Sequence, residues 1–198
     1  MFKSQKSKLK ETKAVVKSRS LLDQVEYCDR NGQHELDISR LNLSVWPQET
    51  VLVSSIRILN AEKNELEVLP NFDHFRGLNE LKLSRNKLSD VHEVRFGSIV
   101  GLRKIDLSRN CLTSLPADIT RLNLLEVLNI RQNKIKALPD GIGSLRSLQE
   151  LDAEYNDLQD VGDALERVAT LESINFLHND NLDVENLGAR TRRLHEKV

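Results

Sequence analysis

Asparagine returns along most of this chain at an almost constant interval, and that interval restricts the folds the chain can adopt. Successive asparagines lie 22, 24, 23, 23 and 23 residues apart, and each one lies within the same motif of apolar residues, which we call the phrase. Around Asn110 the phrase covers residues 102–116 and reads L-x-x-L-x-L-x-x-N-x-L-x-x-L-P. A repeat of about 20 to 50 residues is typical of solenoids, whose coils stack because one coil cannot bury its own apolar side chains. The six asparagines are Asn64, Asn86, Asn110, Asn133, Asn156 and Asn179.

A seventh copy of the phrase precedes these six and lacks the asparagine. It places Leu36 and Ile38 in the apolar slots and Leu41 in the asparagine slot. Leucine occurs 33 times in 198 residues while aromatic residues make up only 4%, so leucine has to fill the core. The chain is therefore predicted to form one repeat domain over residues 33–182. All four prolines fall in one slot of the repeat, as Pro47, Pro70, Pro116 and Pro139.

This pattern resembles the intracellular leucine-rich repeat family, in particular the typical 23-residue class of the Ras-suppressor proteins. In that class L-P is followed by x-x-I-x-x-L, as at residues 138–145 here. The resemblance covers roughly residues 33–182. It implies an α/β solenoid, a right-handed coil of about seven repeats with a parallel β-sheet on its concave side.

The phrase also has a direct physical interpretation. The L-x-L segment predicts a short strand, whose leucines point into the coil while the residues between them point outward. The asparagine turns the chain after the strand, and its side chain can offer both a donor and an acceptor to backbone groups that the turn leaves unpaired. The six asparagines are therefore predicted to form a structural ladder.

Both ends of a solenoid need covering, since a terminal coil otherwise exposes its leucines to water. Residues 20–32, from Ser20 to Gly32, predict a short N-terminal capping helix. Residues 183–198 interleave Val184, Leu187 and Leu194 with basic side chains and predict a C-terminal capping segment. Residues 1–19 carry seven basic side chains and one acidic one, which predicts a disordered tail. A docking arm and a mitochondrial transit segment are the alternatives for this tail.

Motifs of catalysis and metal binding are missing from the sequence. It holds no H-E-x-x-H, G-x-x-x-x-G-K-[ST] or G-x-S-x-G motif, and its histidines lie at no metal-ligand spacing. Cys28 and Cys111 form no C-x-x-C pair and indicate thiols of a reducing compartment. We therefore expect no enzyme activity, no cofactor and no metal, and a chain that is monomeric on its own.

The sequence also bears on location and on nucleic acid. No apolar stretch is long enough for a membrane span. The expected location is the cytoplasm, with the cilium or cytoskeleton as an alternative and the mitochondrion if residues 1–19 act as a transit segment. A net charge of −1 and the lack of stacking aromatics among the basic side chains make nucleic acid an improbable partner.

The repeat register places outward-facing side chains in columns on the concave face. The front and centre of this face are predicted to be basic, and the sixth coil is predicted to be acidic around Tyr155, through Glu150, Asp152, Glu154 and Asp157. Such charges can simply keep a repeat protein soluble, or they can bind an acidic protein segment that an aromatic side chain anchors. The candidate partner-binding residues are Arg40, Lys63, Lys82, Arg85, Lys104, Arg109, Arg131, Tyr155 and Leu177.

The resemblance implies non-catalytic recognition of another protein. The small size favours a structural or scaffold subunit of a larger intracellular assembly, because no further domain is present for an adaptor to deliver. The alternative is a reversible signalling adaptor or regulatory subunit, of the phosphatase or small-GTPase-pathway type, that binds an acidic partner segment on its concave face.

Overall fold

The computed structural model describes residues 23, 34–48, 50 and 55–197. The predicted tail at residues 1–19 lies outside the described residues, as does the predicted capping helix at 20–32 except for Asp23.

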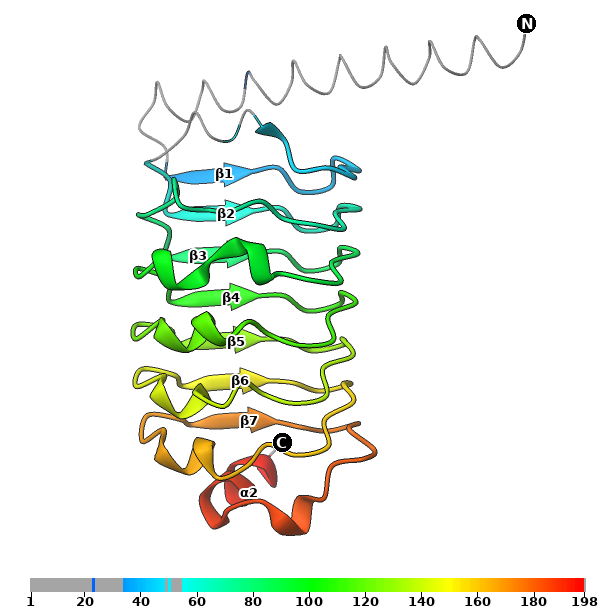
Figure 1. Cartoon of the computed structure of the whole chain (residues 1–198), viewed down its shortest axis with the longest axis vertical. Helices are drawn as coiled ribbons and strands as arrows, with labels where there is room; N and C mark the ends of the chain where they lie inside the picture. Colours follow the sequence, from blue (N-terminus) through cyan, green and yellow to red (C-terminus); the bar gives the residue numbers. More distant parts are fainter. Residues whose placement is uncertain (1–22, 24–33, 49, 51–54, 198) are drawn as a thin grey trace, which may run out of the picture.

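Seven short parallel strands stack in chain order into one sheet (Figure 1). Neighbouring strands pair one repeat apart, so that Leu36 lies opposite Leu59 and Leu59 opposite Leu81. The middle residue of every strand is buried while its two flanking residues are partly or fully exposed, which confirms the predicted parallel solenoid of seven coils. The strands are β1 (Glu35–Asp37), β2 (Ile58–Asn60), β3 (Glu80–Lys82), β4 (Lys104–Asp106), β5 (Val127–Asn129), β6 (Glu150–Asp152) and β7 (Ser173–Asn175).

Short 3₁₀ helices form the convex side of the third to sixth coils (Figure 1). A 3₁₀ helix has about three residues per turn, so residues three apart share a face, which suits the I-x-x-L spacing of the repeat. Ile119 in η4 and Leu122 directly after it are both fully buried, and the Leu122 amide donates to the Ile119 carbonyl. The convex helices are η2 (His92–Val94), η3 (Phe96–Ser98), η4 (Ala117–Arg121), η5 (Ile142–Ser144) and η6 (Ala164–Arg167).

Aromatic side chains supplement leucine in the core of the first coils. Phe72 and Phe75 are fully buried, and the rings of Trp46 and Phe72 lie 4.9 Å apart between centroids. The indole Nε1 of Trp46 donates to the hydroxyl of Thr50 over 2.8 Å, so this buried polar group has a partner.

The last coil is covered by η7 (Val184–Asn186) and by the helix α2 (Ala189–His195), which contacts both β7 and η6. The side chains of Leu187, Thr191 and Leu194 are buried there. Val184, which the sequence assigned to the apolar side of this segment, is 41% exposed because it lies in η7 ahead of the packed helix. The exact domain boundaries stay predictions.

We expect acidification to weaken the packing of α2 on the last coil, because one hydrogen bond between them requires a neutral histidine. The Phe176 amide donates to Nδ1 of His195 over 3.3 Å, and burial lowers the pKa of His195 below its usual 6.5. The folded chain thus binds this proton less readily than the unfolded chain. The stability that neutral His195 contributes is therefore present above pH 6.5 and is lost as the pH falls through the folded-state pKa.

We expect a lower melting temperature at about pH 5 than at pH 7.5, measured by circular dichroism. Burial lowers the pKa of His74 as well, so the informative quantity is the difference between the wild type and His195→Phe. The variant should lose part of the pH dependence. An unchanged pH dependence in the variant would show that His195 does not act as described.

Candidate protein-binding face

The six repeat asparagines are buried, with exposed fractions between 6% and 9%. Oδ1 of Asn110 accepts from the Leu88 amide over 3.1 Å, while its Nδ2 donates to the carbonyls of Leu83 and Leu107 over 3.1 and 2.9 Å. Leu83 and Leu88 belong to the preceding coil and Leu107 to its own. Each asparagine thus ties two coils together at the turn that carries the outward-facing residues.

The residue before each asparagine adopts a left-handed backbone conformation. In the six coils with an asparagine, and at Arg40 before Leu41 in the first coil, this φ lies between 54° and 57°. For a residue other than glycine this conformation costs about 1–2 kcal/mol, which the bonds around the turn must offset. The amide of Arg85 donates to the Ser108 carbonyl over 3.0 Å, and that of Arg109 to the Arg131 carbonyl over 2.8 Å. Position and direction of this column are therefore fixed by the fold. The column is Arg40, Lys63, Arg85, Arg109, Gln132, Tyr155 and His178.

A second column of turn-forming side chains was not predicted from the sequence. Oδ1 of Asp106 accepts from the Ser108 amide over 2.9 Å, and Oδ1 of Asn129 accepts from the Arg131 amide over 3.1 Å. Such a contact two residues ahead supports the turn after the strand. The signal was available, because aspartate or asparagine stands between the two strand apolar residues in every coil except that of Lys82. The column is Asp37, Asn60, Asp106, Asn129, Asp152 and Asn175.

Five of the predicted basic side chains form what we call the basic stripe: Arg40, Lys63, Arg85, Lys104 and Arg109. Among the described residues none of the five forms an ion pair, and all except the partly exposed Lys63 are exposed. Lys82 differs, since its Nζ lies 3.4 Å from the Glu80 carboxylate. The stripe covers the first four coils, and each of these coils contributes one basic residue whose backbone is in the left-handed conformation.

The acidic character expected of the sixth coil is weaker than the sequence suggested. Glu154 is 7% exposed and pairs with the Arg131 guanidinium, and Asn175 Nδ2 donates to it over 3.0 Å. Burial also raises the pKa of Asp152, against a smaller lowering by Arg131. Arg131 and Glu154 hold the same slot in neighbouring coils and therefore meet, so Arg131 is not an unpaired charge on the concave face.

Aromatic and apolar groups gather at this end instead. The rings of Tyr155 and His178 stack at 4.1 Å with an interplanar angle of 10°, and the Arg131 guanidinium lies 5.4 Å from the Tyr155 centroid. Tyr155 is 42% exposed and Leu177 41%. We call Arg131, Tyr155, Leu177 and His178 the aromatic end. Arg131, Tyr155 and Leu177 were predicted from the sequence, whereas the stacking of His178 was not, although the register places His178 next to Tyr155.

The described part of the chain contains no group of three or more side chains that could hold a metal ion. No described helix is long and apolar enough to cross a membrane. Cys111 is exposed and carries a free thiol.

Comparisons with known proteins agree with this architecture. The family model for leucine-rich repeat regions matches residues 55–194. MAP kinase phosphatase with leucine-rich repeats protein 3 of Dictyostelium discoideum is 27% identical over 121 residues, which cover 55% of this chain and 14% of that protein. The chain therefore spans only a small part of this relative.

Two solved structures share the fold. A leucine-rich repeat protein of Leptospira interrogans is 25% identical with a TM-score of 0.55, over 74% of this chain and 46% of that one. An internalin (inlF) of Listeria monocytogenes is 17% identical with a TM-score of 0.55, over 67% of this chain and 38% of that one. Because the family model covers most of the described residues, the chain belongs to the leucine-rich repeat family.

Proposed function

We propose that this chain is a non-catalytic protein-binding module, which holds an acidic segment of a partner on its concave face as a scaffold subunit of a larger assembly. The observation that carries the proposal is the basic stripe, whose side chains have no ion-pair partner among the described residues. Adjacent coils lie about 4.8 Å apart, so successive basic groups can face successive carboxylates of an extended segment. The exposed thiol of Cys111 fits a reducing compartment such as the cytoplasm.

The aromatic end supplies an anchor for such a segment. Aromatic and arginine side chains dominate the energetics of protein interfaces, and Tyr155 is already held against His178 before a partner arrives. A segment with acidic residues followed by an apolar one would match the stripe and this end in turn. The order of the basic stripe and the aromatic end along the coils thus sets the direction in which the partner segment runs.

Tyr155→Ala should weaken binding of the partner by about 30-fold or more, since a truncated anchor residue typically costs at least 2 kcal/mol. The melting temperature should change little, because Tyr155 is 42% exposed. Leu124→Ala is the matched control, as Leu124 is also 42% exposed but lies in the turn before β5. Binding would be measured by isothermal titration calorimetry. Equal losses in the two variants would remove Tyr155 from the interface.

The proposal is tested by purifying the tagged chain from its native cells at about 50 mM and 500 mM salt and identifying the bound proteins by mass spectrometry. Salt screens exposed charge pairs more than buried contacts. Recovery at about 50 mM salt of one fixed set of proteins, among them one with an acidic segment, supports the proposal. Persistence of that set at about 500 mM salt would mark a scaffold that is also held by buried contacts outside the stripe. Failure to recover any partner with an acidic segment would contradict the proposal.

A signalling adaptor is the second candidate. The name of the Dictyostelium relative combines a MAP kinase phosphatase with leucine-rich repeats, and this favours a regulatory role for repeats of this kind. This candidate predicts a single partner that is lost at high salt, so the same purification separates the two functions.

A further inference from the structure

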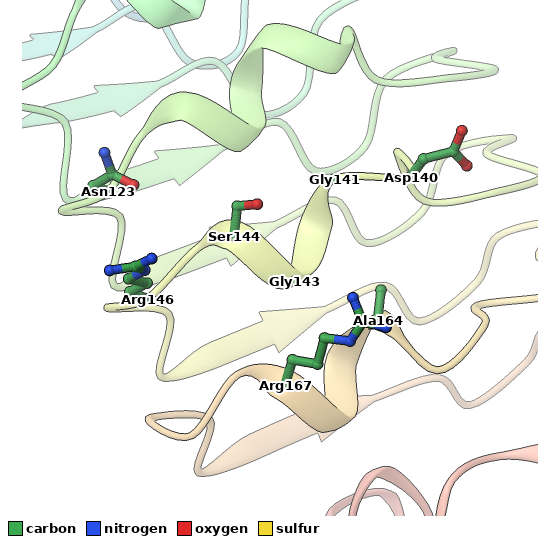
Figure 2. A pocket seen from close by; sticks show the side chains of 8 residues that line it. All are labelled: Asn123, Asp140, Gly141, Gly143, Ser144, Arg146, Ala164 and Arg167. Carbon is green, nitrogen blue, oxygen red and sulfur yellow. The ribbon is translucent and has the colours of Figure 1, made fainter.

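A notch with a volume of about 700 Å³ opens on the convex side between η5 and η6 (Figure 2). Asn123 and Arg146 lie at one end of this notch, Asp140 lies at the other, and Ser144 lies between them. Arg167 extends along the η6 side. The notch lies on the opposite side of the coils from the basic stripe.

Packing between coils explains the two glycines of the fifth coil at the notch, but it does not explain Ser144. A Cβ at Gly143 would lie 2.5 Å from the Ala164 carbonyl oxygen, and one at Gly141 would lie 3.0 Å from the Thr120 hydroxyl. Close packing between coils therefore accounts for both glycines. Ser144 is exposed and is not explained in this way, since the matching positions of the neighbouring coils hold Arg121 and Arg167. The recess at Ser144 leaves room between two longer side chains.

Several arginines on the convex side and at the C-terminal cap already have partners within the chain. Arg95 pairs with Asp73 at 3.6 Å, and Arg190 donates to the carbonyls of Ala169 and Leu171. Arg146 and Arg167, like Arg121 of the fourth coil, form no side-chain hydrogen bond or ion pair with any residue that the structure describes. Unlike Arg121, both of them line the notch. Two exposed guanidiniums thus line one recess with their donors unused.

Two acidic side chains near the notch, Glu166 and Asp140, form no ion pair with these arginines. The Glu166 carboxylate accepts from the amides of Thr191 and Arg190 over 2.7 and 3.3 Å, which commits it to the start of α2. Asp140 lies at the end of the notch away from Arg146 (Figure 2). The notch therefore carries the Arg146 guanidinium at one end and the Arg167 guanidinium beside Ala164, with the exposed Ser144 between Arg146 and Asp140 (Figure 2).

We propose that this convex notch is a second docking surface, which binds an acidic segment of a protein partner through Arg146 and Arg167. Planar guanidiniums bind carboxylates in a bidentate manner, and the volume accommodates several side chains rather than one ion. The inference goes beyond the concave-face function. A chain that binds acidic segments on two opposite sides can bridge two proteins, or two parts of one.

The test uses the full ¹⁵N-labelled chain and a synthetic peptide of six glutamates. Titration should shift the amide resonances of Gly141, Gly143 and Ser144 in a saturable way. In Arg146→Glu/Arg167→Glu these shifts should be lost, with at least about tenfold weaker binding at the notch, while shifts along the basic stripe persist. Arg85→Glu/Arg109→Glu should give the reverse pattern. Arg76→Glu/Arg95→Glu is the convex control and should leave the notch shifts unchanged.

Ser144→Glu is a second variant that leaves both arginines in place. Its carboxylate would occupy the recess, so it should also abolish the peptide-induced shifts at Gly141 and Gly143. Absence of notch shifts in the wild type, with stripe shifts present, would overturn this inference alone. If the peptide shifts the amide resonances at the notch but not those along the basic stripe, the concave-face function alone is overturned. An equal response to inorganic phosphate would mark a simple anion site and overturn peptide docking.

Discussion

Asn110→Ala should lower the free energy of unfolding by about 2–4 kcal/mol. The Leu88 amide donates to Asn110 Oδ1, and among the described contacts it has no other acceptor. The substitution leaves this buried donor unpaired, at a cost of about 1–3 kcal/mol, and adds a small cavity at an interior coil. The carbonyls of Leu83 and Leu107 lose one donor each but keep another, from Asn86 and Asn133 respectively.

Urea denaturation followed by circular dichroism measures this loss. Asn181→Ala is the control, because Asn181 is an exposed turn residue and its substitution should change the free energy of unfolding by less than about 0.5 kcal/mol. A change below about 1 kcal/mol for Asn110→Ala would contradict the structural role of the asparagine ladder.

Arg85→Glu/Arg109→Glu should weaken binding of the acidic partner by more than about 100-fold, because two attractive pairs become repulsive ones at the centre of the stripe. The fold should be unaffected. Both side chains are exposed and unpaired within the described residues, and glutamate meets the same left-handed backbone as arginine does.

Binding in this second experiment is measured by fluorescence anisotropy with the partner recovered by the salt-graded purification. The control Arg76→Glu/Arg95→Glu makes the same change of net charge on the convex side. If Arg85→Glu/Arg109→Glu still binds the partner as the wild type does, the stripe serves only to keep the protein soluble. An equal loss in the control would show that net charge, rather than the stripe, governs binding.

The repeat period was enough to predict most of the fold. The distance between Asn110 and Asn133 equals one coil, so the strand register follows from the sequence once the phrase is aligned. Burial of Leu107 and Leu128 follows from the two-residue period of a strand. The coil length alone, however, does not determine the 3₁₀ form of the convex segments, which depends on packing against the neighbouring coils.

The candidate face was predicted less completely, and the reason is contact between columns. Arg131 and Glu154 each appear in the sequence as an outward charge, but the stacking of adjacent coils brings them together and buries Glu154. The stacking of Tyr155 on His178 depends likewise on the spacing between coils rather than on either residue. The left-handed conformation of Arg85 is a property of the turn that the leucine pattern does not encode.

The central claim, that the basic stripe binds an acidic partner segment, is tested most directly by a charge exchange. Arg85→Glu/Arg109→Glu would be combined with a partner whose facing acidic residues are changed to lysine, and the four affinities of the cycle would be measured under identical salt. The claim predicts that each single change weakens binding and that the combination restores it to within about tenfold of the wild type. Binding that stays as weak in the combination as in the two separate changes would contradict it.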